Sequence, residues 1–159
     1  MTPTWQDTIL NHLDQYYRLA WCYTKNQQDA SDIVQESLYK ALKHQKQQTT
    51  PDAVRTWFYR IVVNTSLDYL KKEKKLVHLD DLQWNTIPAD EAPDPMTTMD
   101  LRAAIETLPF SYKTVIILRY FEDLKISEVA EVLNENENTI KTRIYTALRK
   151  LRIQLEEDI

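Results

Sequence analysis

Apolar side chains recur at steps of three and four residues along most of the chain, which is the spacing of one face of an α-helix. In the N-terminal half this spacing predicts one amphipathic helix over residues 5–23 and a second helix after Asn26. Thr50 followed by Pro51 is typical of a helix start, because threonine caps the free amides and proline fits the first turn. We therefore expect a third helix from Pro51 to about Lys75.

The expected third helix is apolar around most of its circumference. Its polar residues Arg60, Asn64 and Lys71 lie in a narrow strip between two apolar faces. A polar strip on an otherwise buried helix predicts that these residues line a groove. Trp57 and Phe58 are expected in the core, because aromatic side chains at helical spacing are usually core residues.

The C-terminal half predicts shorter helices. Two are expected on either side of Pro109, over residues 100–108 and 115–121. Two more follow, separated by a turn at residues 134–136, and the last of them begins near Asn138. Two helices joined by a short turn, the second carrying hydroxyl and cationic side chains, fit a helix-turn-helix whose last helix enters a DNA major groove. A plain helical hairpin with a solvated charged face is the alternative.

The 159 residues include no glycine. Glycine-rich phosphate loops, dinucleotide-binding fingerprints and the strained turn that presents a hydrolase serine all require it, so these sites are excluded. Two-residue hairpin turns also favour glycine. Together with the helical periodicity, its absence predicts an all-α protein.

Asparagine is expected to replace glycine at the turn between the last two helices. It tolerates the left-handed conformation better than most residues, and it is a preferred N-cap. We expect Asn134 to be the left-handed residue that ends the penultimate helix. Asn138 is expected to cap or lead into the last helix.

Charge is segregated along the chain, although the net charge is only −4. Basic residues gather within residues 71–75 and within residues 138–152, where five basic residues occur with no acid. Residues 76–100 hold six acids, three prolines and no Lys or Arg, which is typical of a linker. We therefore predict two small helical domains, residues 1–75 and 100–159, joined by an acidic, proline-containing linker of residues 76–99.

Candidate catalytic chemistry is sparse. His12, His44 and His78 are far apart in the sequence, and the single cysteine, Cys22, lies among apolar residues. No cluster of these residue types has metal-ligand spacing, so neither a metal nor a cofactor is expected, and an enzyme is the least favoured class. The sequence contains no signal peptide or long apolar run, so we expect a cytoplasmic protein without membrane insertion.

Three stretches resemble conserved regions of the extracytoplasmic-function sigma factors, the smallest sigma subunits of bacterial RNA polymerase. The first is similar to the polymerase-binding stretch of the family's second region, the second to its promoter-opening helix, and the third to its fourth region. Their order, with an acidic linker between them, makes the combined match specific. The three stretches are Asp29–Glu36; Trp57–Asn64 with Asp68; and Leu108–Tyr120 with Ser127–Ala130 and Thr139–Arg143.

The resemblance implies three sets of binding residues. One docks on the clamp helices of the largest polymerase subunit, one holds the non-template strand of the minus-ten element, and one faces the minus-thirty-five element. Within the third set, Arg143 is the best candidate for a guanine or phosphate contact. The sets are Asp32, Gln35, Glu36 and Tyr39; then Arg60, Asn64, Lys71 and Lys72; then Thr139, Lys141, Thr142, Arg143, Thr146, Arg149 and Lys150.

Further partners are implied by the same resemblance. They are the flap of the second-largest polymerase subunit, promoter DNA in duplex and single-stranded form, and an anti-sigma factor. Lys74 and Lys75 would contact phosphates, and the polar loop of residues 44–50 would lie near a flipped base. Tyr59 either stacks on a base or packs in the core. The alternative function is a stand-alone helix-turn-helix regulator, which would bind duplex DNA tightly without polymerase.

Overall fold

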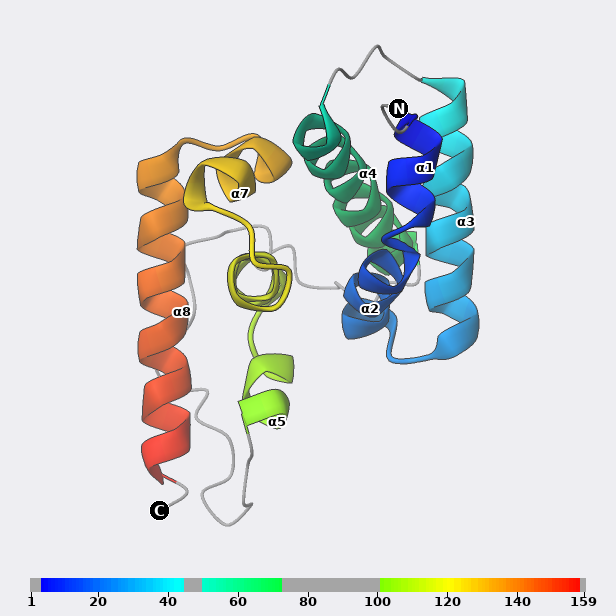
Figure 1. The fold of residues 1–159 in the computed structure, drawn as a ribbon. Helices are drawn as coiled ribbons and strands as arrows, with labels where there is room; N and C mark the ends of the chain where they lie inside the picture. The colour runs from blue at the N-terminus through cyan, green and yellow to red at the C-terminus, as the bar shows by residue number, and fades with distance from the viewer. Residues whose placement is uncertain (1–3, 45–49, 73–100, 158–159) are drawn as a thin grey trace. The chain divides into compact units, whose positions relative to one another are not determined.

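The structure is a computed structural model that describes residues 4–44, 50–72 and 101–157, apart from the side chains of residues 102 and 153–157. Every regular element within these ranges is helical, and no strand occurs in them (Figure 1). The all-α prediction is therefore confirmed.

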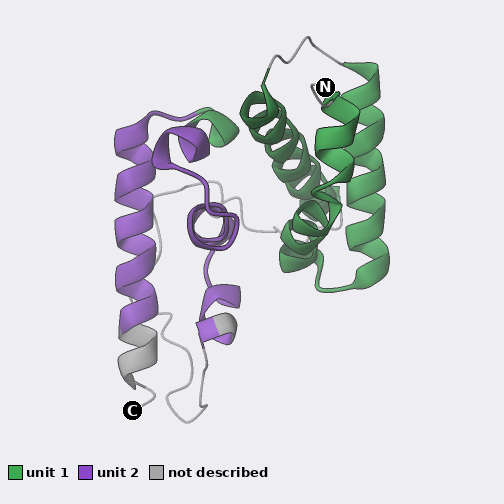
Figure 2. Cartoon of the chain, in the orientation of Figure 1, with its two compact units in different colours: residues 1–77, 131–134 green, residues 78–130, 135–159 purple. Residues whose placement is uncertain are grey.

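The chain divides into two compact units (Figure 2). The first contains residues 1–77 with 131–134, and the second contains residues 78–130 with 135–159. The predicted linker of residues 76–99, the cationic Lys74 and Lys75, and residues 45–49 of the predicted loop lie outside the described residues. The domain boundaries drawn from the sequence stay a prediction.

Four complete helices lie in the described part of the first unit: α1 (Trp5–Leu10), α2 (Leu13–Thr24), α3 (Gln27–Lys43) and α4 (Pro51–Lys72). The helix α4 packs against each of the other three (Figure 1). It begins where the sequence predicts, because the Thr50 hydroxyl accepts a hydrogen bond from the Ala53 amide at 3.1 Å.

The predicted single helix over residues 5–23 is two helices in the structure. A ring nitrogen of His12 lies 2.8 Å from the carbonyl oxygen of Thr8, the group that the His12 amide would bond in a continuous helix. The His12 amide donates instead to the carbonyl of Ile9, and α2 starts one residue later. A side chain that competes for its own backbone acceptor therefore ends α1.

An aromatic cluster joins α2 to α4 in the core of the first unit. The ring of Tyr16 makes edge contacts with those of Phe58 and Tyr59, with centroids 4.6 Å and 4.9 Å away. Tyr59 is fully buried, and its hydroxyl donates to the side-chain oxygen of Gln15 at 3.1 Å. Phe58 is thus a core residue as predicted, and the open question about Tyr59 is settled in favour of packing. Trp57, also predicted in the core, is only half-buried, and its ring makes an edge contact with that of Trp5.

The described part of the second unit contains α5 (Leu101–Glu106), α6 (Phe110–Ile116), a π-helical turn η2 (Ile117–Phe121), α8 (Glu137–Glu157) and the start of α7. The helix α7 runs from Ile126 to Leu133, and its residues 131–133 are grouped with the first unit (Figure 2). The helix α8 packs against α5 and α6. The helix predicted over residues 115–121 starts earlier, directly after Pro109. Its end widens into the π-turn, where the Glu122 amide bonds the Ile117 carbonyl five residues back at 2.9 Å.

Candidate functional site

An exposed acidic stripe lies on α3. Asp32, Gln35, Glu36 and Tyr39 are all exposed, and their spacing places them on one side of the helix. The helix itself is fixed at its start by Asn26, whose side-chain oxygen accepts from the Asp29 amide at 2.7 Å. The sequence-predicted polymerase-binding residues therefore share one accessible surface.

The stripe continues into residues that the sequence reasoning missed. Leu42 lies three residues beyond Tyr39 and is exposed, as is Lys43, whose ammonium lies 5.8 Å from the centroid of the Tyr39 ring. An exposed leucine next to an exposed tyrosine is typical of a surface that another protein covers. Helical spacing could have identified Leu42, because it follows Glu36 and Tyr39 at steps of three residues. The family's motif ends at Glu36 and does not include it.

An exposed polar stripe runs along α4. Arg60, Asn64, Lys71 and Lys72 are exposed, whereas most residues on the remaining sides of the helix are buried. Asp68 is also exposed and lies four residues after Asn64, so it completes the stripe. The four residues assigned to the minus-ten element therefore lie on one exposed side of α4, and the carboxylate of Asp68 lies among them.

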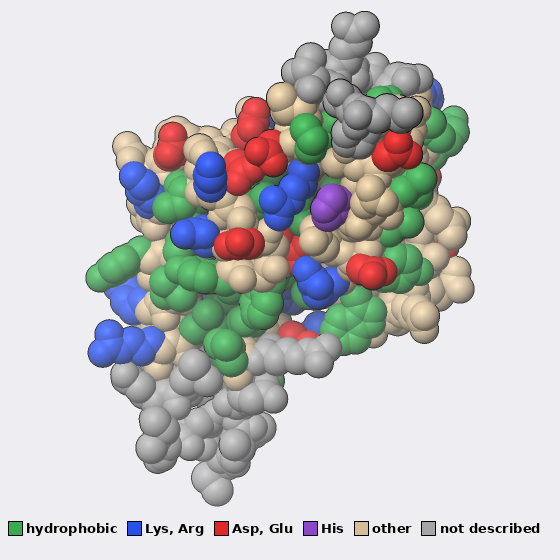
Figure 3. All heavy atoms as spheres, in the orientation of Figure 1, with side chains coloured by type: hydrophobic (Ala, Val, Ile, Leu, Met, Phe, Trp, Pro, Cys, Tyr) green, Lys and Arg blue, Asp and Glu red, His purple; other side chains and the backbone are tan. Residues whose placement is uncertain are grey.

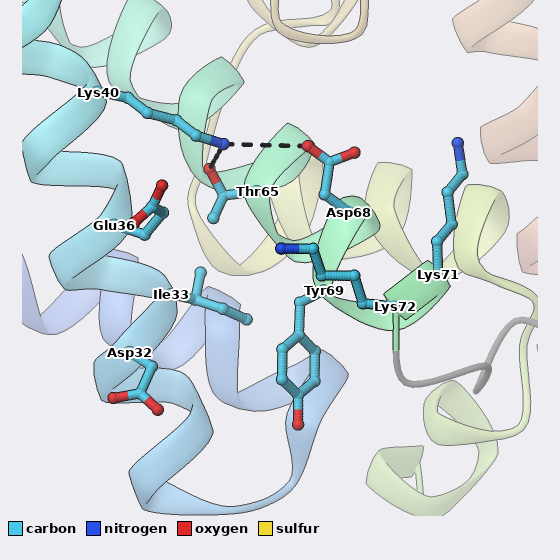
Figure 4. Close-up of a pocket in the computed structure, with 9 residues that line it drawn as sticks. All are labelled: Asp32, Ile33, Glu36, Lys40, Thr65, Asp68, Tyr69, Lys71 and Lys72. Carbon is cyan, nitrogen blue, oxygen red and sulfur yellow. Dashed lines mark hydrogen bonds and ion pairs between the residues drawn. The ribbon is translucent and has the colours of Figure 1, made fainter.

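A groove of about 550 Å³ separates the two stripes (Figure 4). Its lining includes Lys40, whose ammonium donates to the Thr65 hydroxyl at 3.0 Å and lies 3.9 Å from a carboxylate oxygen of Asp68. Because the Asp68 side chain is mostly exposed, solvent screens this ion pair and its contribution to stability is small. Its effect is to orient Lys40 and Asp68 between α3 and α4.

Tyr69 ties the end of α4 to the start of α3. Its hydroxyl donates a hydrogen bond to the carboxylate of Asp29, in the first turn of α3. Asp29 also accepts from the side-chain amide of Asn26. The two helices that carry the exposed stripes are thus joined at both Lys40 and Tyr69.

The turn between α7 and α8 is built from two asparagines. Asn134 has a φ of 55°, so the expected left-handed residue is confirmed. The amide of Glu135 donates to the carbonyl of Ala130 at 2.9 Å, which closes the end of α7. Of the two expectations for Asn138, the cap is wrong: Asn136 caps α8, because its side-chain oxygen accepts from the Thr139 amide at 2.8 Å. Asn138 lies within the first turn of α8.

The left-handed turn gives a direct test by substitution. We expect Asn134→Val to lower the free energy of unfolding by about 1–2 kcal/mol, because a β-branched side chain is disfavoured at positive φ. Asn134→Gly is the matched control and should leave the melting temperature nearly unchanged, since glycine adopts this conformation freely. Thermal melts followed by circular dichroism measure both. An Asn134→Val melting temperature equal to that of the wild type contradicts the role of Asn134.

The residues assigned to the minus-thirty-five element differ in exposure along α8. Lys141, Thr142 and Arg149 are exposed, whereas Thr139, Thr146 and Lys150 are half-buried. Arg143 is buried, with 6% of its side chain exposed. The exposed face of α8 therefore only partly overlaps the face that the sequence predicted to bind DNA, and is turned away from it around the helix axis.

Arg143 is held by the helix-turn-helix turn itself. A terminal nitrogen of its guanidinium donates to a carboxylate oxygen of Glu135 at 3.1 Å. Tyr112 on α6 is close enough for the charges of Arg143 and Arg149 to act on its phenol. Burial raises the pKa of the Tyr112 phenol above its ordinary value, while these two cations lower it. The structure thus gives Arg143 a contact within the unit, and its assigned DNA contact stays a prediction.

Three exposed residues of α8 were missed as candidates. Asn138, Tyr145 and Arg152 lie on the open face with Lys141 and Arg149. Helical spacing could have identified them, because at about 100° per residue all three lie between Lys141 and Arg149 around the helix axis. Lys and Arg side chains and hydrophobic side chains lie next to one another along the outer edge of α8, at the left of Figure 3.

The residues that the structure describes contain no group of three or more His, Cys, Asp or Glu side chains that could hold a metal ion. Within the same part of the chain, no helix is long and apolar enough to cross a membrane.

Comparison with known proteins places these surfaces in a family. The description Sigma-70 region 2 matches residues 8–76, and Sigma-70, region 4 matches residues 98–151. The first match contains the stripes on α3 and α4, and the second contains the helix-turn-helix and most of α8.

Relatives agree with these matches over nearly the whole chain. The chain is 47% identical over 150 residues to RNA polymerase sigma factor SigV of Bacillus subtilis, which covers 94% of this chain and 90% of that protein. It is 30% identical over 165 residues to the ECF RNA polymerase sigma factor SigW of the same organism, with 95% and 88% covered.

A solved structure shares the fold. The sigma factor RpoE from Bartonella quintana, crystallised with the anti-sigma factor NepR, is similar with a TM-score of 0.66 at 20% identity, and the match covers 95% of this chain and 96% of that chain. This likeness agrees with an all-α fold of two sigma domains. The identity to SigV and SigW and the two family matches show that the chain belongs to the extracytoplasmic-function sigma factors of RNA polymerase, which are transcription initiation factors.

Proposed function

We propose that this sigma factor binds core RNA polymerase, directs it to a promoter and opens the minus-ten element with α4. The exposed polar stripe on α4 carries this proposal, because the helix is otherwise largely buried and the stripe combines cations with an amide. Cations hold the phosphates of a melted strand, and the Asn64 amide can pair with the edge of a base that has left the stack.

The acidic stripe on α3 is proposed as the polymerase surface. Asp32 and Glu36 give it negative charge, and Tyr39 and Leu42 give it exposed apolar area. Interfaces of this kind combine an aromatic anchor with charges that set orientation and association rate. The clamp helices of the largest polymerase subunit are the proposed partner, and the flap of the second-largest subunit is the proposed partner of the second unit.

The helix-turn-helix of α7 and α8 is proposed to bind the duplex minus-thirty-five element. The exposed cations Lys141, Arg149 and Arg152 supply phosphate contacts. An anti-sigma factor is a further proposed partner, since the structurally similar RpoE was crystallised with one. The site of action is the cytoplasm, where polymerase and promoter DNA meet.

Transcription with purified components tests this proposal. Core polymerase with this protein is expected to start transcripts from promoter fragments that the complex itself selects from a random DNA pool, and thymines near the start site should become reactive to permanganate. Tight duplex binding by the protein alone, without any gain from polymerase, would instead support a stand-alone helix-turn-helix regulator.

Asn64→Ala is the decisive variant in this experiment. It should reduce permanganate reactivity while leaving polymerase binding intact, because Asn64 is assigned to the melted strand and not to α3. Asn11→Ala is the matched control, since Asn11 is an exposed asparagine of the same unit that is not part of α4. Equal promoter opening by the two variants contradicts the proposed role of Asn64.

A further inference from the structure

Tyr145 is the most exposed of the large hydrophobic side chains that the structure describes. Its side chain is 73% exposed, on the open face of α8. A tyrosine buries a large apolar area when it meets a partner, so leaving it in water forfeits a favourable contact. A partner that covers the ring would therefore gain this contact.

The surroundings of Tyr145 indicate the kind of partner. Lys141 precedes it by four residues and Arg149 follows it by four, so a cation lies one helical turn away on each side. The stretch 138–152 contains no acid that would repel a polyanion. This pattern of an aromatic ring between two cations fits the phosphate-lined major groove of duplex DNA.

The depth of Tyr145 along α8 also suits base contact. It lies about 12 Å along the helix axis from the start of α8, and the N-terminal turns of a recognition helix are the part that reaches base edges. Among its neighbours, Thr142 donates its hydroxyl to the carbonyl of Asn138 at 2.9 Å, so that proton is not directed at DNA. Among the described side chains of this face, Tyr145 offers the largest exposed ring for contact with a base.

We propose that Tyr145 is a specificity-determining residue that contacts the C5-methyl group of a thymine in the minus-thirty-five element. Thymine is the base that presents a methyl group in the major groove, and apolar side chains contact it there. The ring supplies the apolar contact, and the hydroxyl at its tip remains free to meet a phosphate. This inference rests on the proposed function of α8.

Replacing single thymines by deoxyuridine tests the contact, because uracil keeps the base-pairing edge and lacks the methyl group. The wild-type polymerase complex should bind a selected promoter about four-fold more weakly when the contacted thymine is replaced, which corresponds to one buried methyl group. Tyr145→Ala should bind the thymine and uracil promoters equally well. Tyr145→Phe, which keeps the ring, should retain the wild-type difference.

Arg149→Ala is the matched control on the same face. It removes a cation, so it should weaken binding to both promoters by the same factor and keep the preference for thymine. Persistence of the preference in Tyr145→Ala overturns the inference, as does a wild-type complex that responds to no thymine in the element. Weaker binding of Tyr145→Ala to core polymerase without DNA also overturns it, because the partner would then be a protein. Failure of the wild-type complex to bind any promoter would instead overturn the proposed function.

Discussion

Asp32→Lys combined with Glu36→Lys is expected to weaken binding to core polymerase by about 100-fold or more. The two carboxylates are exposed on adjacent turns of α3, so they present a single patch of negative charge. A surface that matches this patch is cationic, and two lysines in place of two acids convert attraction into repulsion. Neither side chain is part of the buried core, so the fold should be retained.

Competition with a labelled sigma factor for core polymerase measures this change. Asp14→Lys combined with Asp52→Lys is the matched control, because it makes the same change in net charge at two exposed acids of the same unit. The control should bind within a few-fold of the wild type. If both double variants bind equally, the acidic stripe on α3 is not the polymerase surface.

Arg143→Met is expected to lower the free energy of unfolding of the second unit by about 1.5–3 kcal/mol, the range for a hydrogen bond to a charged group. Methionine keeps an apolar stem at this buried position but cannot bond Glu135. The loss comes from that pairing, which fixes the turn before α8. If Arg143 contacted only DNA, its replacement would leave the free energy of unfolding of the free protein unchanged.

A double-mutant cycle with Glu135→Gln isolates the interaction. If the pair is the source of the effect, the double variant should lose less stability than the sum of the two single variants, by about 1 kcal/mol or more. Denaturant unfolding gives the free energies, and hydrogen exchange of the α8 amides locates the loss. Strictly additive effects would show that Arg143 contributes by packing alone.

Local side-chain chemistry made much of the fold predictable. Thr50 and Pro51 marked the start of α4, and the strip from Arg60 to Lys71 was visible from periodicity, because a helix repeats its faces every 3.6 residues. Asn134 was expected to be left-handed because no glycine was present to take that position. Each of these predictions depended on contacts within a few residues of sequence.

Predictions failed where two local solutions competed. Asn136 and Asn138 can each cap a helix, and the sequence does not show which one accepts from a free amide. Asn138 was expected to cap or lead into α8; it lies in the first turn, but the cap is Asn136. His12 interrupts α1 and α2 through its ring, although the apolar spacing continues across it. Arg143 lies only about 60° around the helix from the buried Ile140, so its burial depends on whether a partner such as Glu135 is in reach.

The lack of glycine also affects the unfolded chain. Lys25, Asp123 and Asn134 occupy left-handed conformations, so the native state bears the cost of a side chain at each of these positive φ angles. A glycine at any of them would remove that cost, but it would also give the unfolded chain more conformations to lose on folding. Because the unfolded chain has no glycine, it loses less conformational entropy on folding. This smaller loss offsets a part of the cost of the three positive φ angles.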